Sequence, residues 1–329
     1  MLARRRFASL LSGALLAAPS IARARETYPI RPIRPIRLIV PWPAVGGVDA
    51  FGRAVQAALG DQLGQGIVID NIGGGSGRIG TQTAARAAPD GHTLLLVNDT
   101  FAATEALPIA GAAPLRPSFE PITLAISGPQ GIYTHPKSGF RTIDEYVAAA
   151  RAQPGKLNVG TPGIGSSQHL TSELLLRAAG NLRVTHVPYR GGGPLLQDLI
   201  AGTIDAACVT FAAGAEQAKA GRLVPLAVTS EKRTPSFPNV PAAGESAARG
   251  FVQETWMGFL APKDTPQDIR DRVHAAVLAV LKDTTVAGRL RDLGFEPAGL
   301  PQAAFAQLFD HTVRIFADIA TERQIAAGD

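Results

Sequence analysis

The sequence lacks most of what catalytic, metal-binding and disulfide-stabilised proteins need. It has a single cysteine, Cys208, so no internal disulfide can form. The six histidines never fall at the spacing of a zinc motif such as H-E-x-x-H, and no G-x-S-x-G nucleophile motif occurs. We therefore predict no catalytic residue, no metal and no bound cofactor, and interpret Cys208, which lies in an apolar segment, as a structural thiol.

Excess positive charge is also scarce outside the N-terminus. Of the formal net charge of +5, four charges come from arginines in the first 24 residues, which leaves +1 for the remainder. No run of Lys and Arg interleaved with aromatic residues follows. This pattern argues against nucleic acid as a partner.

Residues 1–24 have the three zones of an export signal peptide. Arg4-Arg5-Arg6 form a basic zone, Phe7 to Ala18 are mostly apolar, and Ala22-Arg23-Ala24 is a small-x-small cleavage site. The apolar run is shorter than the ~20 residues that span a bilayer. We expect an exported, periplasmic protein that starts at Arg25, and the arginines leave open whether it uses the twin-arginine route or the ordinary one.

Short apolar runs alternate with helical patterns along the rest of the chain, which is typical of the α/β class. The predicted strands are Ile36–Val40, Ile67–Asp70, Thr93–Val97, Ile122–Ile126, Gly131–Tyr133, Leu157–Val159, Val184–His186, Ile204–Val209, Leu223–Val228 and Trp256–Leu260. The length exceeds one compact core and no Ser/Gly-rich linker occurs, so we expect two lobes joined by crossing strands.

Three strand-to-helix turns are rich in glycine and poor in acids and bases. They are Pro41 to Asp49, Gly160 to Ser167 and Tyr189 to Pro194. Such turns present unpaired backbone N–H groups and helix starts, which favour an anion. At Ser166-Ser167 a simple helix cap explains the sequence equally well.

A second interpretation rests on Gly75 to Gly80, which read G-x-G-x-x-G after a strand and before a helix, with Asp99 19 residues beyond Gly80. This is the pattern of a dinucleotide-binding fingerprint, and it leaves open an exported dinucleotide-dependent oxidoreductase. It follows the second predicted strand instead of the first. A glycine-rich turn that packs on the opposite loop is the alternative we favour.

Several segments together resemble the periplasmic solute-binding proteins of tripartite tricarboxylate transporters, the Bug-type family. They are "YPIRPIRPIRLIVPWPAVGGVDAFGR", "IDNIGGGSGRIG", "PDGHTLLL", "PGKLNVGTPGIGSSQHL", "HVPYRGGG", "AGRLVPLAVTSEKR", "FPNVPAAGE" and "WMGFLAPKDTP". Each piece is modest, but the ordered set covers nearly the whole chain after the leader.

The resemblance implies a type II periplasmic-binding fold, whose two α/β lobes close on a small carboxylated solute. On this sequence we place the first lobe at 25–125, the second at 126–230, and the return to the first lobe at 231–329. We expect a monomer whose partners are a small carboxylate and either the permease subunits of such a transporter or a sensor protein for signalling.

The resemblance also implies a set of ligand-binding residues, which we expect in the turns at the cleft. They are Trp42, Pro43, Ala44, Val45, Gly46, Asp49, Asn98, Gly163, Gly165, Ser166, Ser167, His169, Tyr189, Gly191, Thr210 and Phe211. The chain departs from the family pattern at Val45, where a glycine is usual, and at Ile72, where an arginine is common. Neither the ligand nor its affinity follows from these residues.

Overall fold

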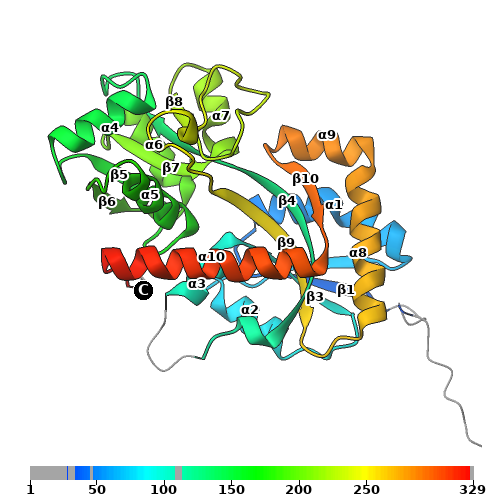
Figure 1. Cartoon of the computed structure of the whole chain (residues 1–329). Coiled ribbons are helices and arrows are strands. Elements are labelled where there is room, and N and C mark those ends of the chain that lie inside the picture. The colour runs from blue at the N-terminus through cyan, green and yellow to red at the C-terminus, as the bar shows by residue number, and fades with distance from the viewer. Residues whose placement is uncertain (1–27, 29–33, 45–46, 108–112, 327–329) are drawn as a thin grey trace, which may run out of the picture.

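The computed structural model describes residues 28, 34–44, 47–107 and 113–326 (Figure 1). The strands are β1 (Ile36–Val40), β2 (Ile67–Asn71), β3 (Thr93–Asn98), β4 (Phe119–Thr134), β5 (Asn158–Thr161), β6 (Thr185–Pro188), β7 (Ala206–Thr210), β8 (Val224–Val228), β9 (Glu254–Pro262) and β10 (Glu296–Leu300). The helices are α1 (Gly47–Leu63), α2 (Arg78–Ala85), α3 (Asp99–Ala106), α4 (Ile143–Ala152), α5 (Ser167–Ala178), α6 (Gly192–Ala201), α7 (Phe211–Lys219), α8 (Gln267–Lys282), α9 (Thr284–Asp292) and α10 (Gln302–Arg323). None of these helices is both long and apolar enough to cross a membrane.

The strands follow the order β2-β1-β3-β9-β4-β7-β5-β6, with β10 and β8 also paired to β4. β1 pairs in parallel with β2 and β3, and β5 pairs in parallel with β6 and β7. Each parallel group carries its own helices, so the predicted α/β fold with two lobes is confirmed.

Two long strands, β4 and β9, connect the lobes. β4 pairs with β9 from Phe119 to Pro129 in the first lobe, and with β7 from Gln130 to Thr134 in the second. Figure 1 shows both strands running from one lobe to the other. The two short strands predicted at 122–126 and 131–133 are therefore one strand.

The chain returns to the first lobe later than predicted. Residues 231–253 were expected there, but Val240 and Ala243 are buried in apolar clusters with α6, β7 and α4 of the second lobe. Burial of these side chains keeps the segment on the second lobe until β9 begins at Glu254. We therefore place the boundaries near residues 129 and 254.

Helix α1 shows how sequence periodicity builds the first lobe. Phe51, Val55, Leu59 and Leu63 recur every four residues, and all are buried. They pack in one cluster with α8 and the first-lobe strands. The start of α1, which directly follows β1, is thereby held at the edge of the sheet that faces the second lobe.

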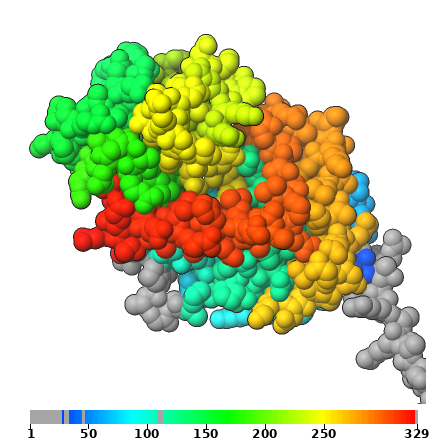
Figure 2. Space-filling view, in the orientation of Figure 1, coloured from blue at the N-terminus to red at the C-terminus, as the bar shows by residue number. Residues whose placement is uncertain are grey.

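The C-terminal helix α10 contacts both lobes. Phe305 and Phe309 are buried in the first lobe, whereas Phe316 and Ile319 pack against Leu170 and its neighbours on α5 of the second. Figure 2 shows α10 lying across the junction of the two lobes. The helix therefore bridges the lobes as well as completing the first one.

Candidate functional site

A cleft of about 760 Å³ lies between the two lobes. The first lobe contributes Trp42, Asn98 and Met257 to its walls, and the second contributes Ser166 and Thr210 among others. Because both lobes form the walls, a hinge motion through β4 and β9 would open or close this cleft.

Five helices begin at the walls of the cleft. Gly47 is the first residue of α1, and the other four helix starts line it through their N-caps. These N-caps are Asn98 for α3, Ser166 for α5, Gly191 for α6 and Thr210 for α7. The first N–H groups of a helix have no carbonyl partner within the helix and carry a partial positive charge, so the arrangement favours an anion.

Few charged side chains add to this field. Among the described residues, only Arg190 and Asp292 are charged and line the cleft, and both are exposed. Arg190 belongs to the second lobe and Asp292 to the first. Backbone groups thus make up most of the positive field, and Arg190 supplies one cation.

The structure places seven of the predicted ligand-binding residues on the wall of the cleft. They are Trp42, Pro43, Ala44, Asn98, Ser166, Gly191 and Thr210. Another seven do not line it: Asp49, Gly163, Gly165, Ser167, His169, Tyr189 and Phe211. Val45 and Gly46 fall outside the described residues.

Three of the residues that do not line the cleft have partners elsewhere in the protein. Asp49 is buried and forms an ion pair with Arg53 of the next helical turn at 2.9 Å. The Tyr189 hydroxyl donates to Asp198 Oδ2 at 2.8 Å. Phe211 is buried and stacks on the Tyr133 ring with centroids 5.5 Å apart. These side chains contact other parts of the protein and do not line the cleft.

The turn between β5 and α5 is held together by its own side chains. The Ser166 hydroxyl donates to the Gly163 carbonyl at 2.8 Å and accepts from the His169 backbone N–H at 3.3 Å. This is the predicted N-cap. His169 Nδ1 also accepts from the Gly165 N–H at 3.1 Å. Gly163, Gly165 and His169 therefore position Ser166, which lines the cleft.

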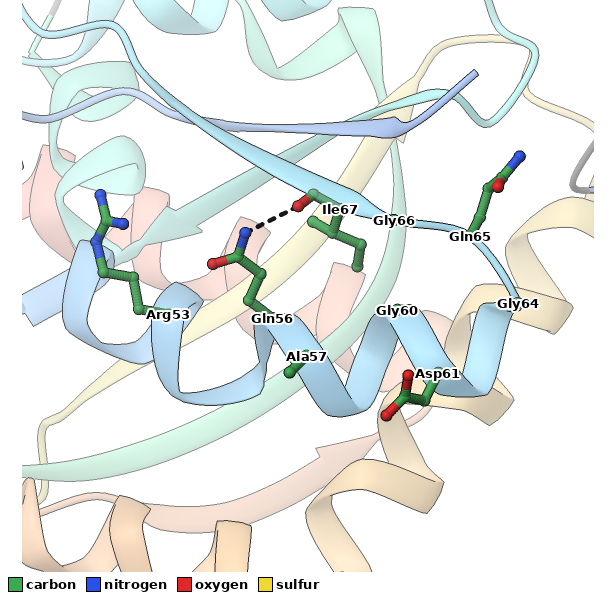
Figure 3. A pocket seen from close by; sticks show the side chains of 9 residues that line it. All are labelled: Arg53, Gln56, Ala57, Gly60, Asp61, Gly64, Gln65, Gly66 and Ile67. Carbon is green, nitrogen blue, oxygen red and sulfur yellow. Dashed lines mark hydrogen bonds between the residues drawn. The ribbon is translucent and has the colours of Figure 1, made fainter. Parts of the chain in front are cut away.

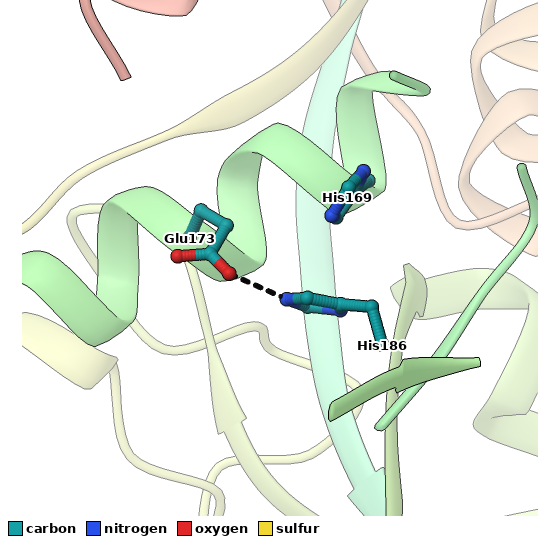
Figure 4. Close-up of side chains that lie close together, drawn as sticks. All are labelled: His169, Glu173 and His186. Carbon is teal, nitrogen blue, oxygen red and sulfur yellow. Dashed lines mark hydrogen bonds and ion pairs between the residues drawn. The ribbon is translucent and has the colours of Figure 1, made fainter. Parts of the chain in front are cut away.

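His169 belongs to a buried cluster with Glu173 and His186 (Figure 4). His186 Nε2 lies 2.7 Å from Glu173 Oε1, and Arg323 of α10 forms an ion pair with Glu173 Oε2 at 2.8 Å. Burial opposes ionisation of Glu173, but the His186 hydrogen bond and the charges of His186 and Arg323 outweigh it and lower its pKa. Burial and the neighbouring His186 lower the pKa of His169 to about 4.

Two imidazoles and a carboxylate are ligands that zinc accepts. Here, however, both Glu173 oxygens already have partners, and Nδ1 of His169 accepts a backbone N–H. A metal would have to break these contacts and would lie beside the guanidinium of Arg323. The cluster is better explained as a link between α10 and the β5–α5 turn.

The last glycine of the motif at 75–80 packs closely on the loop that follows β1. A methyl group at Gly80 would lie 2.4 Å from the Ile72 carbonyl oxygen and 2.8 Å from Pro41 Cα. Asp99, which would have to reach a ribose hydroxyl, is fully buried. The favoured interpretation, a turn that packs on the opposite loop, agrees with this geometry.

Several residues on the cleft wall were not predicted. They are Thr100, Gln168, Thr255, Met257, Asp292, Leu293 and Phe295, among others. Gln168 lies between two predicted positions and Thr100 two residues after the predicted Asn98, so helix starts indicate this part of the wall. Thr255, Met257 and Phe295 come from β9 and the segment before β10, where no local pattern marks a binding residue.

Two other hollows are of comparable size. One, about 820 Å³, lies along α1 and β2 within the first lobe, where Gln56 Nε2 donates to the Ile67 carbonyl at 2.8 Å (Figure 3). The other, about 710 Å³, shares Ala212 and Asp292 with the cleft and is lined by the loop at 230–237. Neither has the set of helix starts that distinguishes the cleft.

Comparison with known proteins gives consistent findings. The profile of the family described as "Tripartite tricarboxylate transporter family receptor" matches residues 51–325. The chain is 34% identical to a UPF0065 protein in the tcbD-tcbE intergenic region of a Pseudomonas species, over 97% of this chain and 95% of the relative. It is 33% identical to the protein BugT of Bordetella pertussis, over 86% of this chain and 85% of BugT.

Solved structures show the same fold. A protein of R. palustris solved with adipate superposes with a TM-score of 0.80 at 29% identity, covering 90% of this chain and 99% of its own. MatC from Rhodopseudomonas palustris, solved with bound malate, gives a TM-score of 0.75 at 29% identity, covering 88% and 99%.

Proposed function

Because the chain belongs to the tripartite tricarboxylate transporter receptor family, whose members are solute-binding proteins, we propose that its cleft captures a small carboxylate in the periplasm for delivery to membrane permease subunits. One observation carries the proposal: five helices begin at the wall of a single cleft between two lobes. The adipate and malate bound by the two structural relatives have the chemistry that such a wall favours.

The other walls suggest the shape of the solute. Trp42, Met257 and Phe295 give the cleft an apolar side, and Arg190 adds a cation. A dicarboxylate with an apolar body matches this combination, with one carboxylate at the helix starts and the second at Arg190. The 760 Å³ volume is ample for a solute of this size.

The test is a thermal-shift screen of the protein from Arg25 onward, followed by calorimetry. Adipate, malate, hexanoate, an aromatic acid, NAD and FAD would be compared, since a ligand that binds the folded state raises the melting temperature. We expect a shift with adipate or malate. A shift with a dinucleotide alone would instead support the oxidoreductase.

Arg190→Gln tests the proposed second carboxylate contact. Loss of one charge-assisted hydrogen bond should weaken adipate binding by about tenfold or more, which corresponds to at least about 1.4 kcal/mol. Hexanoate, which has a single carboxylate, should bind the variant and the wild type alike. Equal loss for both acids would show that Arg190 does not discriminate between them.

A further inference from the structure

Asp99 is a buried carboxyl group that lies one layer behind the wall of the cleft. It is the first residue of α3 and is fully buried. Its sequence neighbours Asn98 and Thr100 both line the cleft, as does Thr255, whose hydroxyl donates to Asp99 Oδ1 at 3.0 Å. A charge on Asp99 would therefore act on a ligand through little intervening protein.

The groups that contact Asp99 come from both strands that join the lobes and from the second lobe. Besides Thr255 of β9, Gln130 of β4 places Nε2 3.5 Å from Oδ2. The Ser167 hydroxyl at the start of α5 also hydrogen-bonds the carboxyl, and it lies 3.4 Å from the Thr100 hydroxyl. The carboxyl group thus contacts both strands that connect the lobes and the start of α5 in the second lobe.

All of these partners are neutral. Gln130 in turn accepts from the thiol of Cys208 on β7 at 3.2 Å, and burial raises the pKa of that thiol, so it stays protonated. On α5 the nearest titratable group is His169, which is neutral at pH 7 because burial lowers its pKa to about 4. Burial without a counter-ion raises the pKa of Asp99 to about 7, although its hydrogen bonds oppose this rise.

We propose that Asp99 determines the affinity for anionic solutes by coupling their capture to the uptake of one proton. An anion at the helix starts is repelled by a negative charge behind the same wall. The protein therefore binds the anion more tightly when Asp99 is protonated. By linkage, the bound ligand holds the proton on Asp99. This inference rests on the proposed function, since it requires an anionic ligand in the cleft.

Affinity should consequently fall as the pH rises through 7. If the ligand raises the pKa of Asp99 by one unit, adipate binds about sevenfold more weakly at pH 8.5 than at pH 6. The carboxyl groups of adipate are ionised across most of this range, so its own titration adds little.

The experiment is calorimetric titration of adipate into the wild type at pH 7.5 in HEPES and in Tris, whose ionisation enthalpies differ. We expect a fraction of a proton taken up per ligand bound. Asp99→Asn should abolish the uptake and the pH dependence of affinity. The control Asp61→Asn removes an exposed carboxylate on α1 and should retain both the proton uptake and the pH dependence of affinity.

A ligand-free measurement supports the assignment independently. Because the pKa of Asp99 is higher in the folded than in the unfolded state, the stability of the wild type falls as the pH rises from about 4 to about 7. The Asp99→Asn variant should not lose stability in this way as the pH rises. Its melting temperature should exceed that of the wild type by more at pH 8 than at pH 5.

The outcomes separate the two proposals. Adipate binding without proton uptake in the wild type, or uptake that persists in Asp99→Asn, would overturn the role of Asp99 and leave the solute-binding proposal standing. If no carboxylate of the panel binds at either pH, the proposed function and this inference both fail. If Asp99→Asn does not fold, a wild-type titration that shows adipate binding without proton uptake still overturns the role of Asp99.

Discussion

Gly80 shows how a glycine motif can serve packing instead of a cofactor. It lies inside α2, where the helix passes close to Pro41 and the Ile72 carbonyl. Both neighbours are backbone, so neither can move aside as a flexible side chain could. The closeness of this contact helps to fix Trp42, which follows Pro41 and lines the cleft.

We expect Gly80→Ala to lower the free energy of unfolding by about 1–3 kcal/mol, because the added methyl group overpacks the contact. Gly288→Ala is the matched control, since Gly288 is also helical and a methyl group there meets no atom within 4 Å. That control should gain about 0.5–1 kcal/mol from helix propensity. Denaturant unfolding measures both, and a stable Gly80→Ala variant would contradict the packing interpretation.

For individual residues, the sequence predicted those cleft positions that lie near helix starts. Trp42, Ser166, Gly191 and Thr210 all follow strands and precede helices, and the structure places each on the cleft wall. The family resemblance also implied Phe211 as a ligand-binding residue, but its ring turns into the second lobe. Which way a side chain points at a helix start depends on packing from distant strands, which no local pattern encodes.

Among the elements, helix α10 is distinguished by its contacts with both lobes. Its final turn places Arg323 against Glu173 of α5, with the two side chains 6% and 10% exposed. Arg323 also lies 3.4 Å from the Leu182 carbonyl through Nη2. The neighbouring residue, Glu322, pairs with Arg177 in a solvent-exposed bridge instead.

Arg323→Gln should lower the free energy of unfolding by about 1.5–3 kcal/mol, because Glu173 loses its guanidinium partner while remaining buried. Glu322→Gln should cost less than about 1 kcal/mol, since exposed pairs contribute little. Hydrogen exchange should locate the effect of Arg323→Gln in α10 and in the β5–α5 turn. If the two variants lost the same free energy of unfolding, burial of the Arg323–Glu173 pair would not add to its contribution to stability.

Element types were largely predictable, and the failures have physical causes. Thr142 and Glu145 form the capping box that their T-x-x-E spacing indicates. In contrast, the pair Thr265-Pro266 is typical of a helix start with a threonine cap, but the Thr265 hydroxyl donates to the Pro262 carbonyl and Pro266 is the N-cap. β10 was missed because its sequence, EPAGL, has no alternating apolar pattern and pairs only through the distant β4.

For the whole molecule, the two lobes meet where Gly294 approaches Ala212 of α7. A methyl group at Gly294 would lie 2.4 Å from the Ala212 Cβ, so the contact leaves no room for a larger side chain. It separates the cleft from the second hollow between the lobes, since Ala212 lines both. It is one of the contacts between the lobes, alongside that of α10 with α5.

Ala212→Leu should therefore hold the lobes apart. We expect small-angle scattering to give a larger radius of gyration than for the wild type, and adipate to bind at least about tenfold more weakly, or about 1.4 kcal/mol. Ala220→Leu, an exposed position just after the same helix, is the control and should change neither quantity. An unchanged radius with weakened binding would indicate that the leucine fills the cleft instead.

The crossing of β4 and β9 also decides how the two lobes are distributed along the chain. The second lobe comprises one uninterrupted stretch, from about residue 129 to 253. The first lobe combines the N-terminal segments with β9, α8 and α10 from the C-terminal end. A chain truncated before β9 therefore lacks Thr255, Met257 and Phe295, and with them part of one wall of the cleft.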